Sequence, residues 1–164
     1  MARSRRQDAG LLVLRAGTGG VLFAHGAQIL FGWFGGPGFA AASVGMERMG
    51  FHPGRPSALL AAGLATPVAG AVAAGAMAGA VAVHTPGGFF SVSGGYEFPA
   101  LLGWTAAALG IAGPGRYSAD HLTGHRLNRP RTARLAFLAT AALTAAVLRR
   151  RAARLPHGPE EPTP

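Results

Sequence analysis

The stretch HTPGGFFSVSGGYEF, residues 84–98, lies between two long apolar segments of the chain. The first segment ends at a histidine, His84, and the second begins at a carboxylate, Glu97. Glycine and aromatic residues fill the loop between them. Because most of the remaining chain is either apolar or basic, we expect this stretch to organise the fold and to hold any ligand site.

The composition favours a helical membrane protein. The 164 residues are 49% hydrophobic and only 13% charged, and the chain is rich in glycine. Between Arg55 and Glu97 the only acidic or basic side chain is His84. An uncharged run of this length is typical of segments that lie in lipid. The absence of cysteine excludes disulfides and thiolate chemistry.

The basic residues also favour a membrane. All 15 of them are arginines, and they give the chain a formal net charge of +9. Most flank apolar segments, for example Arg3, Arg5 and Arg6 before the first and Arg149, Arg150, Arg151 and Arg154 after the last. Arginines at helix ends anchor membrane proteins at phosphate headgroups, so we interpret the charge in this way and predict no nucleic-acid binding.

The amino-terminal part is predicted to contain a tail and a first membrane helix. Residues 1–9 form a disordered basic tail in this prediction, and residues 11–34 form the helix. Arg15, His25 and Gln28 interrupt it with polar groups that are costly in lipid unless they face protein or water. Because His25 and Gln28 are three residues apart, they share a helix face. That face either packs on another helix or meets a ligand.

The middle of the chain leaves two interpretations open. A short interfacial helix is expected over residues 39–49, followed by an uncharged segment over residues 57–83 that Pro67 divides. The segment is either one long kinked helix or a half-helix followed by a span from about residue 67 to residue 84. A GxxxG motif at residues 75–79 predicts close helix packing.

Two more apolar helices are expected after the central loop, over residues 98–111 and 135–148, with a basic loop at 116–134 between them. Residues 150–164 are predicted to form a disordered tail. The fold expected for residues 10–149 is therefore all-α, a transmembrane helical bundle of about four membrane helices plus a short interfacial helix.

Two points remain open in this prediction. His121 and His125 have the i, i+4 spacing of a metal-binding pair, but we interpret them as part of a solvated basic loop and predict no metal site. Four and five membrane passes both remain possible topologies, because each places one arginine-rich segment on the side that the positive-inside rule disfavours.

Several motifs, taken in this order, resemble the DoxX family of small bacterial membrane proteins. They are Leu14-Arg15, His25-Gly26, Val83-His84, Gly94-Gly95-Tyr96-Glu97-Phe98, and Gly113-Pro114-Gly115-Arg116 followed by Asp120. The resemblance covers about residues 11–120. It implies a multi-pass helical bundle in a bacterial plasma membrane. It also implies that Arg15, Gly26, Gly94, Gly95, Gly113, Pro114, Gly115, Arg116 and Asp120 are structural positions of that fold.

Two charged residues that are usual in the family are missing here. Family members usually carry a lysine where this chain has Ile29, and a glutamate in a longer second helix. The two residues are tolerated in lipid only as a pair, because either charge alone would be uncompensated, so the loss of both leaves no unpaired charge. The polar residues that remain are His25, Gln28, His84 and Glu97.

Two classes of function fit these features. The first, implied by the resemblance, is a subunit of a redox system, either accessory or quinone-linked. Its candidate residues for ligand binding or proton relay are His25, Gln28, His84, Phe89, Phe90, Tyr96 and Glu97. The second is a non-catalytic membrane scaffold or assembly protein, in which polar residues lock the bundle and the arginines bind anionic lipid or a cytoplasmic partner.

A small-solute transporter fits less well, because few polar residues line the expected spans and no inverted repeat is visible. The chain also lacks a complete catalytic constellation, so we do not predict an enzyme that acts by itself. Quinone is the one cofactor that the resemblance implies. The expected partners are the lipid bilayer, a membrane or cytoplasmic redox protein, and a second copy of this chain.

Overall fold

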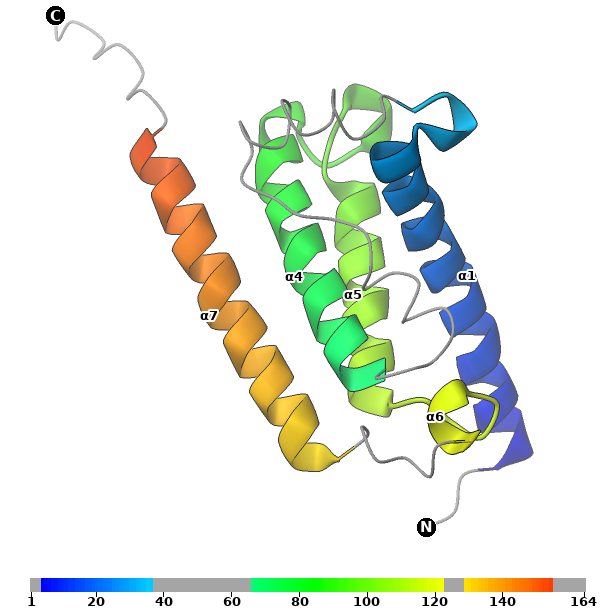
Figure 1. Cartoon of the computed structure of the whole chain (residues 1–164). Coiled ribbons are helices and arrows are strands. Elements are labelled where there is room, and N and C mark those ends of the chain that lie inside the picture. Colours follow the sequence, from blue (N-terminus) through cyan, green and yellow to red (C-terminus); the bar gives the residue numbers. More distant parts are fainter. Residues whose placement is uncertain (1–3, 37–65, 123–128, 155–164) are drawn as a thin grey trace, which may run out of the picture.

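The computed structural model describes residues 4–36, 66–122 and 129–154, and every regular element among them is helical (Figure 1). The α-helices are α1 (Arg5–Phe31), α4 (Thr66–His84), α5 (Glu97–Ala112), α6 (Ala119–Leu122) and α7 (Pro130–Arg154), and short 3-10 turns occur at Trp33–Gly35, Thr85–Gly87 and Ser91–Ser93. The predicted all-α class is therefore confirmed for the described residues.

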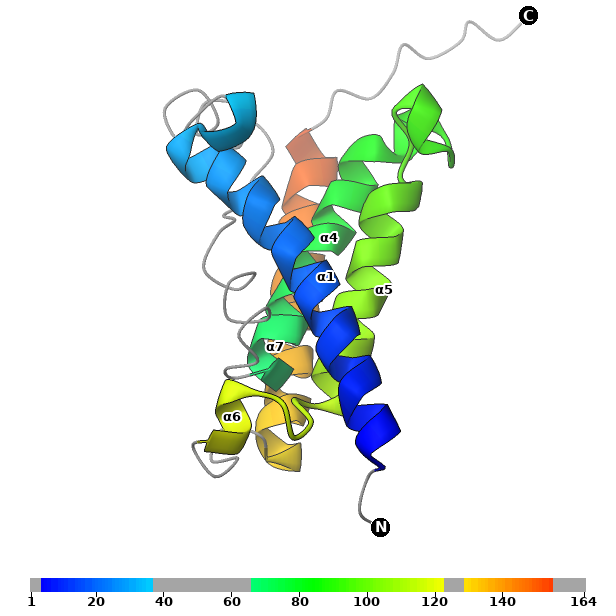
Figure 2. The same ribbon diagram turned by 90° about the vertical axis from the view of Figure 1, so that its right-hand side faces the viewer.

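Helix α4 lies at the centre of the arrangement. It packs against α5 on one side and α7 on the other, and α1 packs against α5. Helices α1, α4 and α7 run in one direction and α5 runs in the other (Figure 1). Figure 2 shows α1 crossing in front of α4 and α5 at an angle.

The bundle therefore has two distinct ends. One end, called the amino end here, holds the start of α1, the end of α5, helix α6 and the start of α7 (Figure 1). The other, called the hairpin end, holds the loop that joins α4 to α5 together with the ends of α1 and α7.

Small residues let the central helices approach closely. The buried apolar core consists of Leu22, Ala69, Ala73, Leu102, Ala106 and Leu109, from α1, α4 and α5. A Cβ atom added to Gly70 would lie only 2.7 Å from the Ala106 carbonyl oxygen and from the Gly110 Cα. The backbones of α4 and α5 therefore meet at Gly70, where there is no room for a side chain.

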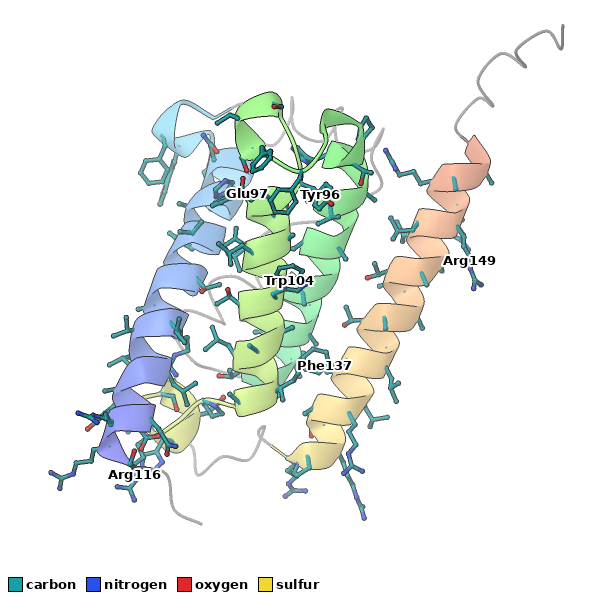
Figure 3. All side chains as sticks on the ribbon, turned by 180° about the vertical axis from the view of Figure 1, so that it is seen from behind. Tyr96, Glu97, Trp104, Arg116, Phe137 and Arg149 are labelled. Atoms are coloured by element: carbon teal, nitrogen blue, oxygen red, sulfur yellow. The ribbon has the colours of Figure 1, made fainter. Side chains whose placement is uncertain are left out.

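The GxxxG motif packs against α7. A Cβ atom on Gly75 would collide with the side chain of Thr140 and lie 2.8 Å from the Thr144 hydroxyl, and Gly79 is buried. Phe137 of α7 points toward α4 and α5, where its ring reaches Gly110 (Figure 3). The close helix packing that this motif predicts is confirmed.

The start of the chain differs from the prediction. Helix α1 begins at Arg5, so residues 5–9 are helical rather than part of a disordered tail. The physical reason is a capping box, in which the Gln7 N–H donates to the Ser4 hydroxyl and the Ser4 N–H donates to the Gln7 side chain, at 3.3 and 2.9 Å. Gly32, in the left-handed conformation with φ 70°, ends α1 three residues before the expected boundary.

The last helix is also longer than predicted. Helix α7 includes Arg131 and Arg134 at its start and continues to Arg154, so the basic loop is shorter and residues 150–154 are not disordered. Pro130 suits the first helical position, and arginine is a good helix former. Arg151 also donates a hydrogen bond of 3.1 Å to the Ala82 carbonyl near the end of α4.

The other expected elements fall into two groups. Helix α5 matches the expected helix at 98–111 to within one residue at each end, and α4 ends at His84. The choice between one long kinked helix and a half-helix followed by a span rests on residues 57–65, which lie outside the described residues. The interfacial helix at 39–49 and the half-helix before Thr66 lie outside the described residues, as do residues 155–164.

Within the described part of the chain, two helical segments are long and apolar enough to cross a membrane. They are α4 with the turn that follows it, Thr66–Gly87, and α7 over Pro130–Ala153. Helix α5 is apolar but has only 16 residues.

Substitution of Gly70 tests the α4–α5 crossing. We expect Gly70→Val to lower the free energy of unfolding by about 1–3 kcal/mol, because the added carbons must push the two backbones apart. Thermal unfolding in detergent, followed by circular dichroism, measures the loss. Gly20→Ala is the matched control, since nothing lies within 4 Å of a Cβ atom at Gly20. Equal losses for both variants would contradict the close crossing.

Candidate functional site

Most of the buried polar side chains among the described residues lie at the amino end of the bundle, around Arg15. The Arg15 side chain belongs to α1, yet the residue is only 2% exposed. Its two terminal nitrogens donate to the carbonyl oxygens of Pro114 and Tyr117 in the loop after α5. Gly113 and Gly115 give this loop its course, since both have positive φ, 79° and 70°. One buried guanidinium therefore holds the loop to α1.

Asp8 holds the same loop from two turns earlier on α1. Its Oδ1 accepts a hydrogen bond of 3.2 Å from the Arg116 N–H, and its Oδ2 lies 3.8 Å from Arg116 Nε. The Asp8 side chain is buried, whereas the Arg116 side chain is 58% exposed and lies at the surface of this end (Figure 3). A Cβ atom on Gly115 would lie 3.2 Å from Asp8 Oδ1, so the loop backbone passes close to this carboxylate.

Asp120 connects the cluster to α4. It is fully buried in α6, and its Oδ2 accepts a hydrogen bond of 3.0 Å from the Thr66 N–H. That N–H belongs to the first residue of α4 and has no acceptor within its own helix. The charge of Asp120 also stabilises the Arg15 cation. This end of the bundle thus holds two carboxylates, of which Asp8 pairs with Arg116 and Asp120 acts by its charge on Arg15.

We call this set the Arg15 cluster, and it consists of Asp8, Arg15, Thr66, Pro114, Arg116, Tyr117 and Asp120. Several of its members are motif residues of the predicted family resemblance, and the structure brings them together from about 100 positions apart. Asp8 was missed because it lies in an arginine-rich segment. The available signal is its spacing: Asp8 and Arg15 are seven residues apart and so share a helix face. Gly26, another motif residue, is buried in α1.

At the hairpin end, two glycine pairs lie backbone to backbone. A Cβ atom on Gly95 would collide with the Gly88 carbonyl oxygen, and one on Gly87 would lie 2.7 Å from the Gly94 carbonyl oxygen. The Tyr96 N–H donates to the Gly88 carbonyl at 3.1 Å, which closes the loop. Gly88 and Gly94 also have positive φ, 79° and 77°. The close approach therefore explains the need for Gly87 and Gly95, and the positive φ explains Gly88 and Gly94.

The predicted pocket residues at this end are engaged mainly with their own loop. Glu97 accepts a hydrogen bond of 3.1 Å from the Ser91 N–H and stands at the start of α5, where the helix dipole favours a carboxylate (Figure 3). The ring of Phe89 packs edge to face against those of Phe90 and Tyr96, with centroids 5.2 and 5.6 Å apart. The three rings form one cluster in which Phe89 and Phe90 are exposed.

The two histidines share one arrangement. His25 Nδ1 lies 3.0 Å from the Val21 carbonyl oxygen, and His84 Nδ1 lies 2.8 Å from the Ala80 carbonyl oxygen. A carbonyl only accepts, so Nδ1 carries a proton in each ring, and Nε2 of the neutral tautomer is then an acceptor. The His25 ring also packs on Phe98 at 5.8 Å, which brings α1 to the start of α5. Among the described residues, His84 and Glu97 form no hydrogen bond or ion pair with each other.

The remaining candidates are placed as follows. Gln28 is half-buried and packs against the turn after α1, where a Cβ atom on Gly36 would collide with its carbonyl and its side chain. Among the described residues, no group of three or more histidine or carboxylate side chains could hold a metal ion. His121 lies in α6, and His125 lies outside the described residues.

Over residues 4–36, 66–122 and 129–154 the fold is all-α, with two helices long and apolar enough to cross a membrane. No family model, curated protein or solved structure matches it. The resemblance to the DoxX family therefore stays a prediction that rests on the motif residues.

Removal of Arg15 tests the cluster. We expect Arg15→Met to lower the free energy of unfolding by about 3–5 kcal/mol, because it leaves buried Asp120 without its cation. Thermal unfolding in detergent measures this. Adding Asp120→Asn should recover part of the loss, since asparagine still accepts the Thr66 N–H bond but carries no charge.

The matched control is Arg116→Met, which removes an exposed guanidinium from the same cluster. A smaller loss than for Arg15 is expected there, because the Arg116 side chain is 58% exposed and its backbone N–H, which the substitution keeps, still donates to buried Asp8. Equal losses for the Arg15 and Arg116 variants would contradict a central role for Arg15.

Proposed function

We propose that this chain is a DoxX-type integral membrane protein. It forms a multi-pass helical bundle in a bacterial plasma membrane and serves as an accessory subunit of a redox system, without enzymatic activity of its own. The observation that carries the membrane part is the surface of α7. No residue of its most apolar stretch is buried within the bundle.

A soluble protein buries a helix of this kind. In α7, Leu135, Leu138 and Leu143 are 68%, 69% and 68% exposed, although the helix is long and apolar enough to span a bilayer. Contiguous exposed apolar surface of this extent marks a membrane or protein contact. Lipid is the better occupant, because arginines flank the apolar part of α7 at both of its ends.

The length of α7 agrees with this placement. Arg134 and Arg149 bracket an apolar stretch about 22 Å long at 1.5 Å per residue. That is shorter than the hydrocarbon core of about 30 Å, and arginine side chains that extend to the headgroups cover the difference. The outer faces of the other helices continue the apolar surface, as Leu101, Trp104 and Ile111 of α5 illustrate (Figure 3).

The arrangement of the two ends supports five passes over four. The start of α1 and the loop held by Arg15 lie at the amino end, and α7 finishes at the hairpin end (Figure 1). In a topology with five passes, the amino terminus and the basic loop lie on the same side of the membrane. In a topology with four passes, they lie on opposite sides. With the amino end in the cytoplasm, that loop obeys the positive-inside rule.

The accessory role is supported by what the polar side chains do. Arg15, Asp8 and Asp120 join helices to one another, and Glu97 caps a turn of its own loop. These residues stabilise the bundle rather than converge on a shared reacting atom. The Arg15 cluster also assembles motif residues of the family, which supports the DoxX assignment.

A quinone-linked role is the second candidate, and His25 favours it. Its exposed ring packs on Phe98, and the free Nε2 suits a hydroxyl donor, so a quinol fits this residue better than a quinone carbonyl. When bound, the quinol would supply the electrons of the redox system. His25 would orient its hydroxyl by accepting a hydrogen bond.

Membrane extraction tests the main proposal. We expect the chain to stay in the membrane pellet after an alkaline carbonate wash and to be released by detergent. Leu138→Arg combined with Leu143→Arg should abolish stable insertion, because each arginine costs about 2.5–3.5 kcal/mol at the centre of a membrane helix. The matched control is Leu122→Arg, which changes an exposed leucine of α6 outside the proposed spans. Release of the unmodified chain by carbonate alone would refute the proposal.

Titration with a menaquinol analogue tests the second candidate. We expect His25→Ala to weaken binding about fivefold to tenfold, the value of one hydrogen bond, with smaller effects from His84→Ala and Glu97→Gln. His121→Ala at the amino end is the control and should bind normally. Identical affinities for the unmodified chain and the His25 variant would exclude the role.

A further inference from the structure

A hollow at the start of α7 is lined by three arginines. Its lining consists of Arg129, Pro130, Arg131 and Arg134, all exposed, and its volume is about 450 Å³. The first turn of α7 contains no acidic residue. None of the three guanidinium groups has an ion pair or hydrogen bond with the other described residues, in contrast to Arg15, Arg116 and Arg151.

The position of these arginines on the helix is electrostatically unfavourable. They stand at the amino end of α7, where the helix dipole is positive and where the first N–H groups have no acceptor within the helix. The three like charges also repel one another. An anion in the hollow would relieve both effects and would accept from guanidinium and backbone donors together.

The opposite end of α7 makes a direct comparison. Arg149 and Arg150 stand at the carboxyl end, where the dipole is negative and favours a cation. Arg149 points away from the bundle (Figure 3), and Arg151 is bonded to the Ala82 carbonyl. The arginines at the carboxyl end of α7 thus have a favourable electrostatic environment, whereas those at its amino end have no partner among the described residues.

The position of the hollow relative to the bilayer indicates which anion it binds. Arg134 is followed directly by Leu135, the first exposed leucine of the apolar stretch of α7. If α7 spans the membrane as proposed, the hollow lies at the border of the hydrocarbon core, at the level of the lipid phosphates. Arginine suits this site, because its planar guanidinium binds phosphate oxygens in pairs.

We infer that the hollow formed by Arg129, Arg131 and Arg134 binds the phosphate of an anionic phospholipid at the amino end of α7. This inference rests on the proposed membrane location. The lipid is anionic rather than zwitterionic, because the lining has three positive charges and no carboxylate to pair with an ammonium group. The bound lipid neutralises the start of α7 and fixes its depth in the bilayer.

The purified full-length chain tests the inference in detergent micelles. Native mass spectrometry measures the retention of added phosphatidylglycerol and phosphatidylcholine. We expect a preference for phosphatidylglycerol of at least about tenfold, since each arginine near an anionic surface contributes about 1 kcal/mol. The triple variant Arg129→Gln, Arg131→Gln, Arg134→Gln should retain both lipids equally. Arg134→Gln alone should reduce the preference about fivefold and serves if the triple variant does not fold.

The comparison is the pair Arg149→Gln and Arg150→Gln, which removes two charges from the end of the same helix where the dipole favours a cation, and it should reduce the preference less than Arg134→Gln alone. An unmodified chain without preference, or an Arg134 variant that keeps the full preference, would overturn the inference. Displacement of phosphatidylglycerol by millimolar inorganic phosphate would also overturn it, in favour of a site for a free anion. Failure of the membrane proposal is seen separately, as release of the chain by carbonate.

Discussion

The buried guanidinium of Arg15 is the interaction on which the rest of the bundle depends. A cation in this position must be paired, because burial removes its hydration. The pairing comes from two loop carbonyls, at Pro114 and Tyr117, and from the nearby carboxylate of Asp120. Because Asp120 also binds the first N–H of α4, one charge connects the start of α1, the loop after α5 and the start of α4.

The two ends of the bundle are built on different principles. The amino end is held by charges from segments far apart in the chain, whereas the hairpin end is closed by backbone hydrogen bonds within one short loop. Between them, Gly70 lets α4 approach the backbone of α5, and Gly75 leaves room for the side chains of Thr140 and Thr144 of α7. A core with so many small residues buries little apolar area. Many large apolar side chains remain on the outside, which is the arrangement suited to lipid.

The candidate site shows where sequence reasoning succeeds and where it is incomplete. The loop around Glu97 was recognised because its glycines and its helix-starting carboxylate are local signals, and the structure gives both a local reason. The disordered tail predicted for residues 1–9 is wrong for residues 5–9, which are helical. That prediction relied on the arginines and did not include the capping box at Ser4 and Gln7. Asp8 was overlooked for the same reason, although its burial completes the Arg15 cluster.

The sequence by itself determined that α1, α4, α5 and α7 are helical and, to within a few residues, where α1, α4 and α5 end. Those features depend on residues that are close together in the chain. Apolar runs favour helices, and the glycines that follow α1 and α5 adopt the positive φ that ends each helix. Only the tertiary structure decided that Arg15 meets Pro114, and that α7 leaves its apolar surface uncovered. Both are contacts between segments far apart in the chain, and no local pattern of residues specifies which distant surface a helix face will meet.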